Sequence, residues 1–334
     1  MKFPLSFIHK TSLIGFLLSI FACFPLWHGL KNLPAIPVLN VFSNIPYGVT
    51  FFILAVMLIG LGASLFITKQ KILTPITLLS YFVLILFDVN RFHPEYYFFS
   101  LTLLIVYLFE TKKVSEQNAL LLLRLLISAI YVFTGLHKMT EAFVPNVYTP
   151  MLRPLKDILP GSLFGFMMKL SFFIPLTEVF IGIALWVPKL KNITWKISLA
   201  LHASVLILLL IHNFNYSVYP WNIAMVIFSY ILCKSSYDFH IIKNIKESIW
   251  LKLAIFQLLL VPASHFFNIA GSSVSFDVYT GKYAYTYVYV TSDMYAQFPG
   301  YLKKQCKRID QEYEDYKLYL DVWAQQEMNA SIYY

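Results

Sequence analysis

The sequence predicts an all-α polytopic membrane protein of about nine transmembrane helices with a small α+β extracytoplasmic domain at its C-terminus. Three observations predict this class: an apolar composition, a series of long apolar runs, and a polar, tyrosine-rich tail. Of the 334 residues, 58% are hydrophobic and 13% are charged, whereas a soluble domain has about 45–50% apolar and about 25% charged residues. The composition excludes a soluble enzyme and a disordered chain. We expect no nucleic-acid partner, despite the net charge of +9.

The apolar runs define the expected membrane domain, residues 1–267. About 18 or more apolar residues cross the roughly 30 Å of hydrocarbon in a bilayer. The runs are continuous rather than alternating, which excludes a transmembrane barrel. They lie near residues 11–30, 49–68, 72–89, 96–110, 118–137, 163–187, 194–212, 219–234 and 249–267.

The positions of lysine and arginine predict the orientation, because cytoplasmic loops carry an excess of both. With the N-terminus inside, the inner segments carry about twice as many as the outer ones. We therefore expect an integral protein of the plasma membrane, of the bacterial inner-membrane type, with a cytoplasmic N-terminus and an extracytoplasmic C-terminus. The inner set is Lys2, Lys10, Lys69, Lys71, Lys112, Lys113, Lys189, Lys191, Lys196, Lys234, Lys243, Lys246 and Lys252.

The first apolar run has two interpretations. Lys2 and Lys10 precede it, and Ala22-Cys23 resembles a lipoprotein cleavage site. Phe21 fits such a site poorly, and the run continues to Trp27 at a membrane-interface position. These features favour a retained first helix over a cleaved signal.

The tail, residues 268–334, has no membrane-spanning run and is expected to form a separate α+β domain. Apolar and aromatic residues alternate over 274–278 and 283–289 around Thr280-Gly281-Lys282, which predicts a β-hairpin. Residues 317–320 predict a further strand, and Asp321 predicts the N-cap of a short helix through Met328. One continuous amphipathic helix from Ile309 to Met328 is the alternative.

Three ionisable residues within apolar runs form the first candidate cluster, because such residues are costly in a membrane and mark functional sites. At about 1.5 Å per residue, Arg124, Glu178 and His202 lie roughly 9, 13 and 12 Å from the inner ends of their helices. This shared depth predicts an Arg124–Glu178 ion pair with His202 nearby. The cluster is either a structural pair that fixes helix packing or a proton-relay or cofactor-anchoring site.

A second candidate cluster lies at the outer helix ends, where six of the eight histidines occur on helix bodies or outer ends. If these helices adjoin, their polar residues line an outward-facing vestibule. Lys138 there is a candidate base, because desolvation disfavours its charged form; the alternative is an ammonium that reaches the interface. Two proline-rich loops, 31–48 and 138–161, are expected to cover the vestibule. The outer residues that we single out are His28, Asp88, Asn90, Arg91, His93, Glu95, His137, Glu141, His212, Asn213, Asn215, Trp221, Asn222 and His265.

A metal centre is not expected. His93, His137 and His212 offer nitrogen ligands, but no histidine pair has a ligand spacing. His202 and His212 lie about 15 Å apart along one helix, too far to share an ion. Hydrolase and P-loop motifs are absent from the sequence.

The segment from Leu122 to Met139 contains Tyr131-Val132-Phe133-Thr134-Gly135-Leu136-His137-Lys138. It resembles the aromatic–small–Gly–x–x–Lys–Leu helix of the HTTM superfamily, the membrane domain shared with vitamin K-dependent γ-carboxylase. Asn90-Arg91-Phe92-His93 with Tyr96-Tyr97, then Glu178, His202 and Tyr219-Pro220-Trp221-Asn222, follow the family's order. The resemblance covers about residues 85–230. It consists of scattered matching residues that occur in the same order, and not of a long identical stretch. DoxX-like and MauE-like membrane proteins share the layout.

The resemblance implies a protein that acts on or with a quinone, so quinone is the candidate cofactor. It places Lys138 where the carboxylase has the lysine that deprotonates vitamin K hydroquinone. His137 stands where the carboxylase has another lysine, and the large lumenal part has no counterpart. Glutamate carboxylation is therefore not expected.

Two functions from different classes follow. In the first, the protein acts on a quinone or another lipid-soluble substrate at the outer face. Lys138 is then the base, aided by His137 and His93. His212, Trp221, Asn222 and Arg91 bind the cofactor, and Arg124, Glu178 and His202 hold the helix core. In the second, the protein is a non-catalytic accessory protein that binds a protein partner through its tail. A transporter is a weaker third, because the sequence shows no inverted repeat.

Overall fold

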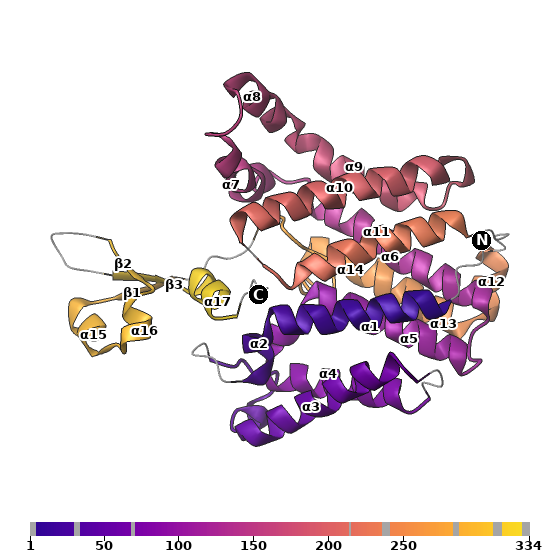
Figure 1. Ribbon diagram of the computed structural model, residues 1–334, viewed down its shortest axis with the longest axis horizontal. Coiled ribbons are helices and arrows are strands. Elements are labelled where there is room, and N and C mark those ends of the chain that lie inside the picture. The colour runs from indigo at the N-terminus through magenta and orange to yellow at the C-terminus, as the bar shows by residue number, and fades with distance from the viewer. Residues whose placement is uncertain are drawn as a thin grey trace.

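The computed structural model describes residues 5–29, 34–67, 71–213, 215–235, 241–282, 287–309 and 316–328. A bundle of helices forms most of the molecule, and a small sheet projects from one end (Figure 1). Among these residues six helical stretches are long and apolar enough to cross a membrane, and two shorter apolar helices accompany them. These helices support the membrane class, while the count of nine spans remains a prediction. The six stretches are Leu5–Ala22, Tyr47–Ser64, Glu116–Lys138, Gly161–Ala184, Pro188–His212 and Ile249–Phe267.

Helices occur in each of the nine apolar runs. The helices of the bundle are α1 (Leu5–Ala22), α2 (Phe24–His28), α3 (Tyr47–Ser64), α4 (Leu73–Phe87), α5 (Pro94–Glu110), α6 (Glu116–Lys138), α7 (Thr149–Leu152), α8 (Gly161–Lys169), α9 (Phe173–Ala184), α10 (Lys191–His212), α11 (Val218–Lys234), α12 (Ile241–Glu247), α13 (Ile249–Ile255) and α14 (Val261–Ser264).

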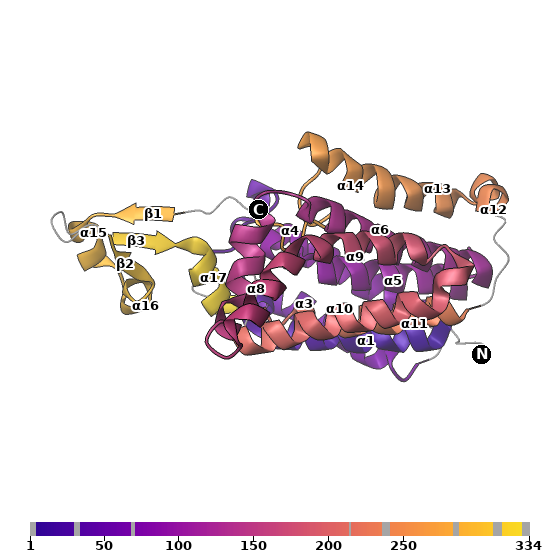
Figure 2. The same cartoon turned by 90° about the horizontal axis from the view of Figure 1, so that it is seen from above.

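Helix α6 lies at the centre of the bundle. Ser115 caps its N-terminus by accepting a hydrogen bond from the backbone N–H of Asn118 at 3.2 Å. Leucine, isoleucine and alanine occur on every side of the helix. Of the 18-residue stretch that is long and apolar enough to cross a membrane, 83% is buried, as expected for a helix that is apolar all round. It packs against α5, α9, α11 and α13. The α3–α4 pair lies on one flank (Figure 1), and α13 and α14 lie along another (Figure 2).

Two glycines set the distance between α6 and α9. A Cβ atom on Gly135 would lie 2.6 Å from the carbonyl oxygen of Pro175, and one on Gly182 would lie 2.9 Å from that of Ser128. Each helix therefore presents a glycine to the other's backbone, the arrangement by which small residues allow membrane helices to approach closely. The hydroxyl of Ser128 donates to the carbonyl of Gly182 at 2.9 Å.

The projecting part of the tail contains a three-stranded antiparallel sheet of order β1-β3-β2. Lys317 of the central strand lies opposite Tyr289 and Lys307, and its Nζ lies over the rings of Tyr289 and Tyr319, at 5.4 and 5.0 Å from their centroids. The elements are β1 (Tyr287–Val290), α15 (Ser292–Gln297), α16 (Gly300–Lys303), β2 (Cys306–Arg308), β3 (Tyr316–Tyr319) and α17 (Leu320–Met328).

The tail corrects two expectations. The strand predicted at 317–320 and the helix through Met328 are present as β3 and α17, which excludes the continuous helix from Ile309. The predicted hairpin is wrong, because β1 pairs with β3 and residues 272–276 form turns. Residues 283–286 of that hairpin lie outside the described residues. The helix starts one residue before the expected cap, at Leu320.

Residues 271–282, which we call the plug segment, pack into the end of the bundle from which the sheet projects (Figure 1), instead of pairing as a strand. Phe276, Val278 and Thr280 are buried, and the Phe276 ring stacks on Tyr97 with centroids 5.9 Å apart. Phe276 and Tyr279 have φ near +56° and +55°, a conformation that is strained for aromatic residues and persists only where packing enforces it. The tail therefore begins as part of the helical body, and the sheet follows at Tyr287.

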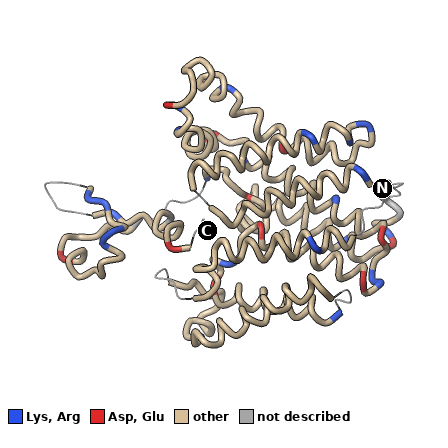
Figure 3. The backbone as a smooth tube through the Cα atoms, viewed as in Figure 1, with Lys and Arg blue, Asp and Glu red and all other residues tan. Residues whose placement is uncertain are grey.

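Charge is distributed unevenly along the bundle. Most lysine and arginine positions of its helices lie toward the end that holds the N-terminus, opposite the sheet (Figure 3). The N-terminal end of the described chain thus lies at the lysine-rich end of the bundle, and the tail sheet lies at the other end (Figure 1 and Figure 3). The direction in which the bundle crosses a membrane remains a prediction.

Candidate functional site

The close approach of α6 and α9 places Lys138 against Glu178. Lys138 lies one turn after Gly135 on α6, and Glu178 lies one turn before Gly182 on α9. The Lys138 Nζ donates to Oε1 and Oε2 of Glu178 at 2.7 and 2.8 Å. Only 9% and 12% of the two side chains are exposed. Lys138 is thus held by a carboxylate within the bundle instead of reaching out to the interface.

The expected Arg124–Glu178 pair is not formed. The Arg124 guanidinium donates to the carbonyl of Leu232 at 2.6 Å, near the far end of α11, and lies 6.0 Å from the ring centroid of Trp186. Arg124 precedes Lys138 by about 21 Å of helix, so it cannot share that lysine's partner. The depth estimate assumed that α6 begins level with the end of α9. In the structure α9 ends at Ala184, and Trp186 just beyond it donates to Ser128, well inside α6, at 2.7 Å. Glu178 therefore faces the last turn of α6.

His202 belongs to a hydrogen-bonded chain on the same side of α6. Its Nδ1 lies 2.7 Å from Oδ1 of Asn222, and its Nε2 lies 2.7 Å from the hydroxyl of Tyr131. The Asn222 amide donates to the carbonyl of Val218, so its oxygen faces His202 and accepts from Nδ1–H. Nε2 shares the next hydrogen bond with the Tyr131 hydroxyl, which in turn lies 2.8 Å from the Ser198 hydroxyl.

The ion pair and the His202 chain line one cavity of about 130 Å³ between α6, α9, α10 and α11. Most of its wall is apolar, as in small-molecule sites that a few polar groups orient. We call it the polar cavity. Its lining residues are Ile130, Tyr131, Thr134, Lys138, Phe143, Val147, Tyr148, Met151, Ile174, Glu178, Leu201, His202, Ser204, Val205, Leu208, Trp221, Asn222, Met225, Val278 and Tyr279.

Two segments outside the bundle helices complete the wall. Four residues of the loop 139–160 line the polar cavity, and His212 Nε2 lies 2.9 Å from the carbonyl of one of them, Met151. The plug segment adds Val278 and Tyr279. The prediction that the second proline-rich loop covers the site agrees with this placement. The first loop lies elsewhere: the backbone N–H of Val38 donates to Leu86 at the end of α4.

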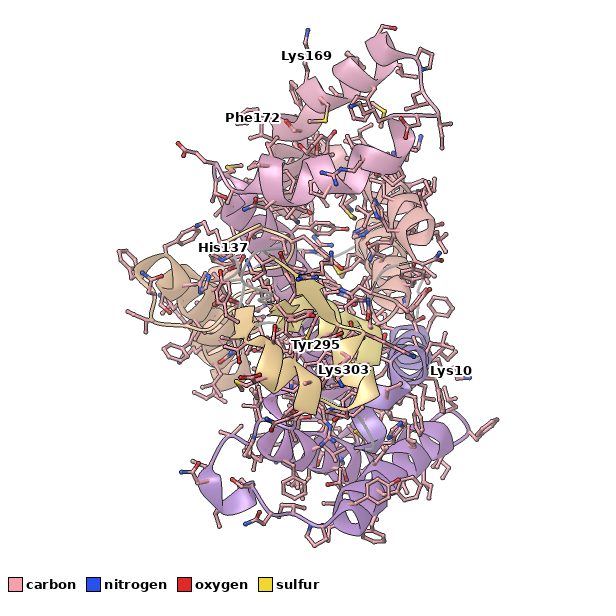
Figure 4. The ribbon with its side chains drawn as sticks, turned by 90° about the vertical axis from the view of Figure 1, so that its left-hand side faces the viewer. Lys10, His137, Lys169, Phe172, Tyr295 and Lys303 are labelled. Atoms are coloured by element: carbon pink, nitrogen blue, oxygen red, sulfur yellow. The ribbon has the colours of Figure 1, made fainter. Side chains whose placement is uncertain are left out.

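His137 lies beside the polar cavity rather than in its wall. Its ring packs edge-on against His265, with centroids 4.9 Å apart, and lies 4.5 Å from Phe266. His265 Nδ1 lies 2.6 Å from the carbonyl of Ala270, and its Nε2 lies 2.9 Å from Oδ2 of Asp277. Seen from the tail end, His137 lies near the middle of the molecule, while Lys169 lies at its edge (Figure 4). His137 thus contacts the segment that holds the plug.

Arg91 and His93 are buried away from the polar cavity. Arg91 donates to the carbonyls of Leu26, Leu84 and Trp27 at 3.3, 3.0 and 3.3 Å, so it caps the ends of α2 and α4, a structural task. His93 Nδ1 lies 3.2 Å from Oε1 of Glu95, which also accepts from the Ser217 hydroxyl. Neither residue lines the site for which the sequence nominated it.

The structure thus brings together Lys138, Glu178, His202, Trp221 and Asn222 of the nominated residues, and leaves the other five outside the polar cavity: His93, His137, His212, Arg91 and Arg124.

Sequence reasoning also missed a member of the site. Tyr131, Thr134 and Lys138 are spaced i, i+3 and i+7 on α6 and line the polar cavity together. That spacing puts residues on one helix face, so it was a usable indication for Tyr131.

Within the described residues no group of three or more histidine, cysteine, aspartate or glutamate side chains is arranged to hold a metal ion.

Comparison of the chain with protein-family models, curated proteins and solved structures finds no match.

Proposed function

We propose that the chain is an integral membrane protein of about nine spans, with its N-terminus in the cytoplasm, that binds a quinone or another lipid-soluble substrate in the polar cavity. The observation that carries the proposal is a small, mostly apolar cavity in which a lysine–glutamate pair and a histidine–tyrosine chain converge. Buried ionisable groups are costly in a membrane and mark functional sites by default. The resemblance of residues 85–230 to HTTM and DoxX-like proteins supports the same substrate class.

In this proposal Lys138 is the base and Glu178 makes it one. A proton passes from the Lys138 ammonium to the Glu178 carboxylate across 2.7 Å, leaving a neutral amine beside a carboxylic acid. The amine then accepts a proton from an acidic O–H of the bound substrate, which for a quinone is the O–H of its reduced hydroquinone form, and the substrate becomes an anion next to the restored ammonium. One proton moves in each step, and the positive charge returns where the negative charge develops, the arrangement that stabilises such a transition state.

The test is equilibrium binding of a short-chain quinone, decyl-1,4-benzoquinone, to the full chain in lipid nanodiscs. We expect Lys138→Ala to weaken binding by at least tenfold, because Lys138 is the only lysine or arginine among the described residues that line the polar cavity. The matched control is Lys169→Ala, since Lys169 is an exposed lysine at the end of α8. Melting curves of both variants report whether they fold.

The result that would overturn the proposal is a folded wild-type protein that does not bind the quinone, or one whose Lys138→Ala and Lys169→Ala variants bind it equally well. A stoichiometric endogenous quinone retained through purification by wild type, and lost by Lys138→Ala, would support it independently.

The accessory function is the second candidate, and exposed apolar side chains on the tail favour it. Val288, Tyr289 and Met294 are 38%, 68% and 51% exposed on the projecting part, and each offers apolar surface to a partner. If this function holds, Val288→Asp abolishes association with the partner and leaves quinone binding unchanged. Lys138→Ala then leaves the association intact.

A further inference from the structure

A larger cavity lies at the lysine-rich end of the bundle, away from the polar cavity. It has a volume of about 550 Å³ and is formed by the turn between α5 and α6 together with the junction of α12 and α13. Figure 2 shows α12 and the start of α13 at the end of the bundle that holds the N-terminus. We call it the lysine cavity, because its wall contains Lys112 and Lys113. Its one acidic residue is Glu247.

The three charged side chains of the lysine cavity are exposed and remain available to a ligand. Within the described part of the chain, none of them forms an ion pair with another residue, although all three line the same space. Two ammonium groups bind a phosphate through charge-assisted hydrogen bonds, and a carboxylate binds a cation in the same way. The complementary ligand therefore carries both a phosphate and a positive charge.

Two candidate membrane spans begin at the lysine cavity. The stretch Glu116–Lys138 starts directly after the wall residue Ser115, and the stretch Ile249–Phe267 starts at a wall residue. A cavity at the start of two spans lies where the hydrocarbon ends and the lipid headgroups begin. Trp250, also in the wall, is of a residue type that is enriched at this level. The position of the cavity thus favours a phospholipid headgroup as its ligand.

An exposed apolar stripe leads from the lysine cavity along the second of these spans. Ile249, Leu253, Phe256 and Leu260 are each at least half exposed, and their spacing is that of one helix face. The stripe starts in the cavity wall at Ile249 and continues into the span. It offers a surface to an acyl chain whose headgroup is held in the cavity, whereas a soluble phosphate compound would leave it unused.

We infer that the lysine cavity binds a phospholipid whose headgroup carries a phosphate and a primary ammonium, which is the chemistry of phosphatidylethanolamine. Lys112 and Lys113 donate to the phosphate oxygens, and Glu247 accepts from the ammonium N–H groups. Phosphatidylglycerol has no ammonium, and the quaternary ammonium of phosphatidylcholine has no N–H, so neither lipid can donate an ammonium hydrogen bond to Glu247. This site is separate from the polar cavity and does not depend on the function proposed for it.

The experiment measures binding of dioleoyl phosphatidylethanolamine, phosphatidylglycerol and phosphatidylcholine to the delipidated full chain in detergent, by native mass spectrometry. We expect wild type to bind the first lipid most tightly. Lys112→Gln with Lys113→Gln should weaken that binding at least tenfold, because two cations near the lipid phosphate are lost. The matched control is Lys71→Gln with Lys189→Gln, which removes the same charge from two exposed lysines outside the lysine cavity.

Glu247→Gln tests the recognition of the ammonium. We expect this variant to bind phosphatidylethanolamine about fivefold more weakly and phosphatidylglycerol more tightly, because it lacks the carboxylate that accepts from an ammonium and repels an anionic headgroup. Inorganic phosphate and glycerophosphoethanolamine, which is the same headgroup without acyl chains, should not displace the lipid at equal concentration. Melting curves of all variants report whether they fold.

Three results would overturn this inference. Equal lipid binding by the two double lysine variants would place the lipid outside the lysine cavity. A wild type that prefers phosphatidylglycerol or phosphatidylcholine, or a Glu247→Gln variant with an unchanged preference, would show that no ammonium is recognised. Displacement of the lipid by inorganic phosphate or glycerophosphoethanolamine would indicate a soluble ligand. Quinone binding at Lys138 is measured separately, so the proposed function stands or falls independently of these results.

Discussion

The Nε2 atom of His265 lies 2.9 Å from the Oδ2 atom of Asp277, and this contact requires a proton between the two atoms. The other ring nitrogen, Nδ1, lies 2.6 Å from the carbonyl of Ala270, which only accepts, so Nδ1 must carry its own hydrogen. His265, in the turn that follows α14, thus links the helical bundle to the plug segment, and the contact fixes Asp277 one residue before a wall residue of the polar cavity.

Breaking this pair should loosen the plug segment. We expect Asp277→Ala to raise at least fivefold the rate at which a cysteine in place of Thr280, a residue with no exposed surface, reacts with a maleimide. Asp277→Asn is the matched control, because an amide N–H can still donate to a neutral His265 ring. The background carries Cys306→Ser. Equal labelling rates in the two variants would show that the pair does not hold the plug segment.

The Lys138–Glu178 pair should behave as a coupled unit in stability measurements. Removing one partner of a buried pair leaves an uncompensated charge and costs about 3–5 kcal/mol. We therefore expect Lys138→Met alone to destabilise the protein by about that amount, and Lys138→Met with Glu178→Leu to cost less than the single change. Denaturation in detergent measures the cycle, with the exposed Lys196→Met as control. Additive costs would contradict a coupled pair.

The helix contact that creates the pair should tolerate no side chain at its two glycines. Alanine at Gly135 or Gly182 would place a Cβ atom 2.6 or 2.9 Å from a backbone oxygen of the other helix, closer than real contacts allow. We expect each variant to lower the melting temperature by several degrees, because overpacking costs about 1–3 kcal/mol. Gly165→Ala on α8, where nothing lies within 4 Å, should be neutral or stabilising. Similar melting temperatures for all three variants would show that α6 and α9 are not tightly packed.

The three cysteines provide a test of the orientation. Cys23 and Cys233 are buried and Cys306, on β2, is partly exposed. A membrane-impermeant thiol reagent added to intact cells should therefore label the wild-type protein and leave Cys306→Ser unlabelled. Labelling that requires broken cells would place the tail in the cytoplasm and reverse the proposed orientation.

The same label should show an unusual pH profile. Partial burial raises the pKa of the Cys306 thiol, and only the thiolate reacts. At a given pH below that pKa, Cys306 therefore has less thiolate than a free cysteine, and its labelling rate continues to rise at pH values where the rate of free cysteine has levelled off. A profile that superimposes on that of free cysteine would show that the thiol is not shielded by the sheet.

The membrane class and the positions of the helices could be predicted from the sequence because long apolar runs have few alternative structures. Lys138, Glu178 and His202 could be nominated for the same reason: an ionisable residue in such a run needs a partner. The choice of partner could not be predicted. It depends on how far α9 extends beside α6, and this is set by Gly135, Gly182 and the end of α9 at Ala184.

The tail shows a different limit. Alternating apolar residues in 274–278 predicted a strand, yet Phe276 and Val278 bury their side chains in the bundle. Alternation of apolar residues reports only which local conformation a segment favours. Here the segment instead buries its apolar side chains against the bundle, where Phe276 stacks on Tyr97. The histidines illustrate the same limit: their positions at helix ends were evident from the sequence, but the pairing of His265 with Asp277, twelve residues later, depends on how the tail packs against the bundle.

The plug segment has a mechanical consequence. Val278 and Tyr279 form part of the wall around the polar cavity, and the sheet begins only eight residues after Tyr279, at Tyr287. A force that draws the sheet away from the bundle acts on the segment that carries these two wall residues, and the His265–Asp277 contact resists it. A partner that pulled on the sheet would therefore act on the wall of the polar cavity.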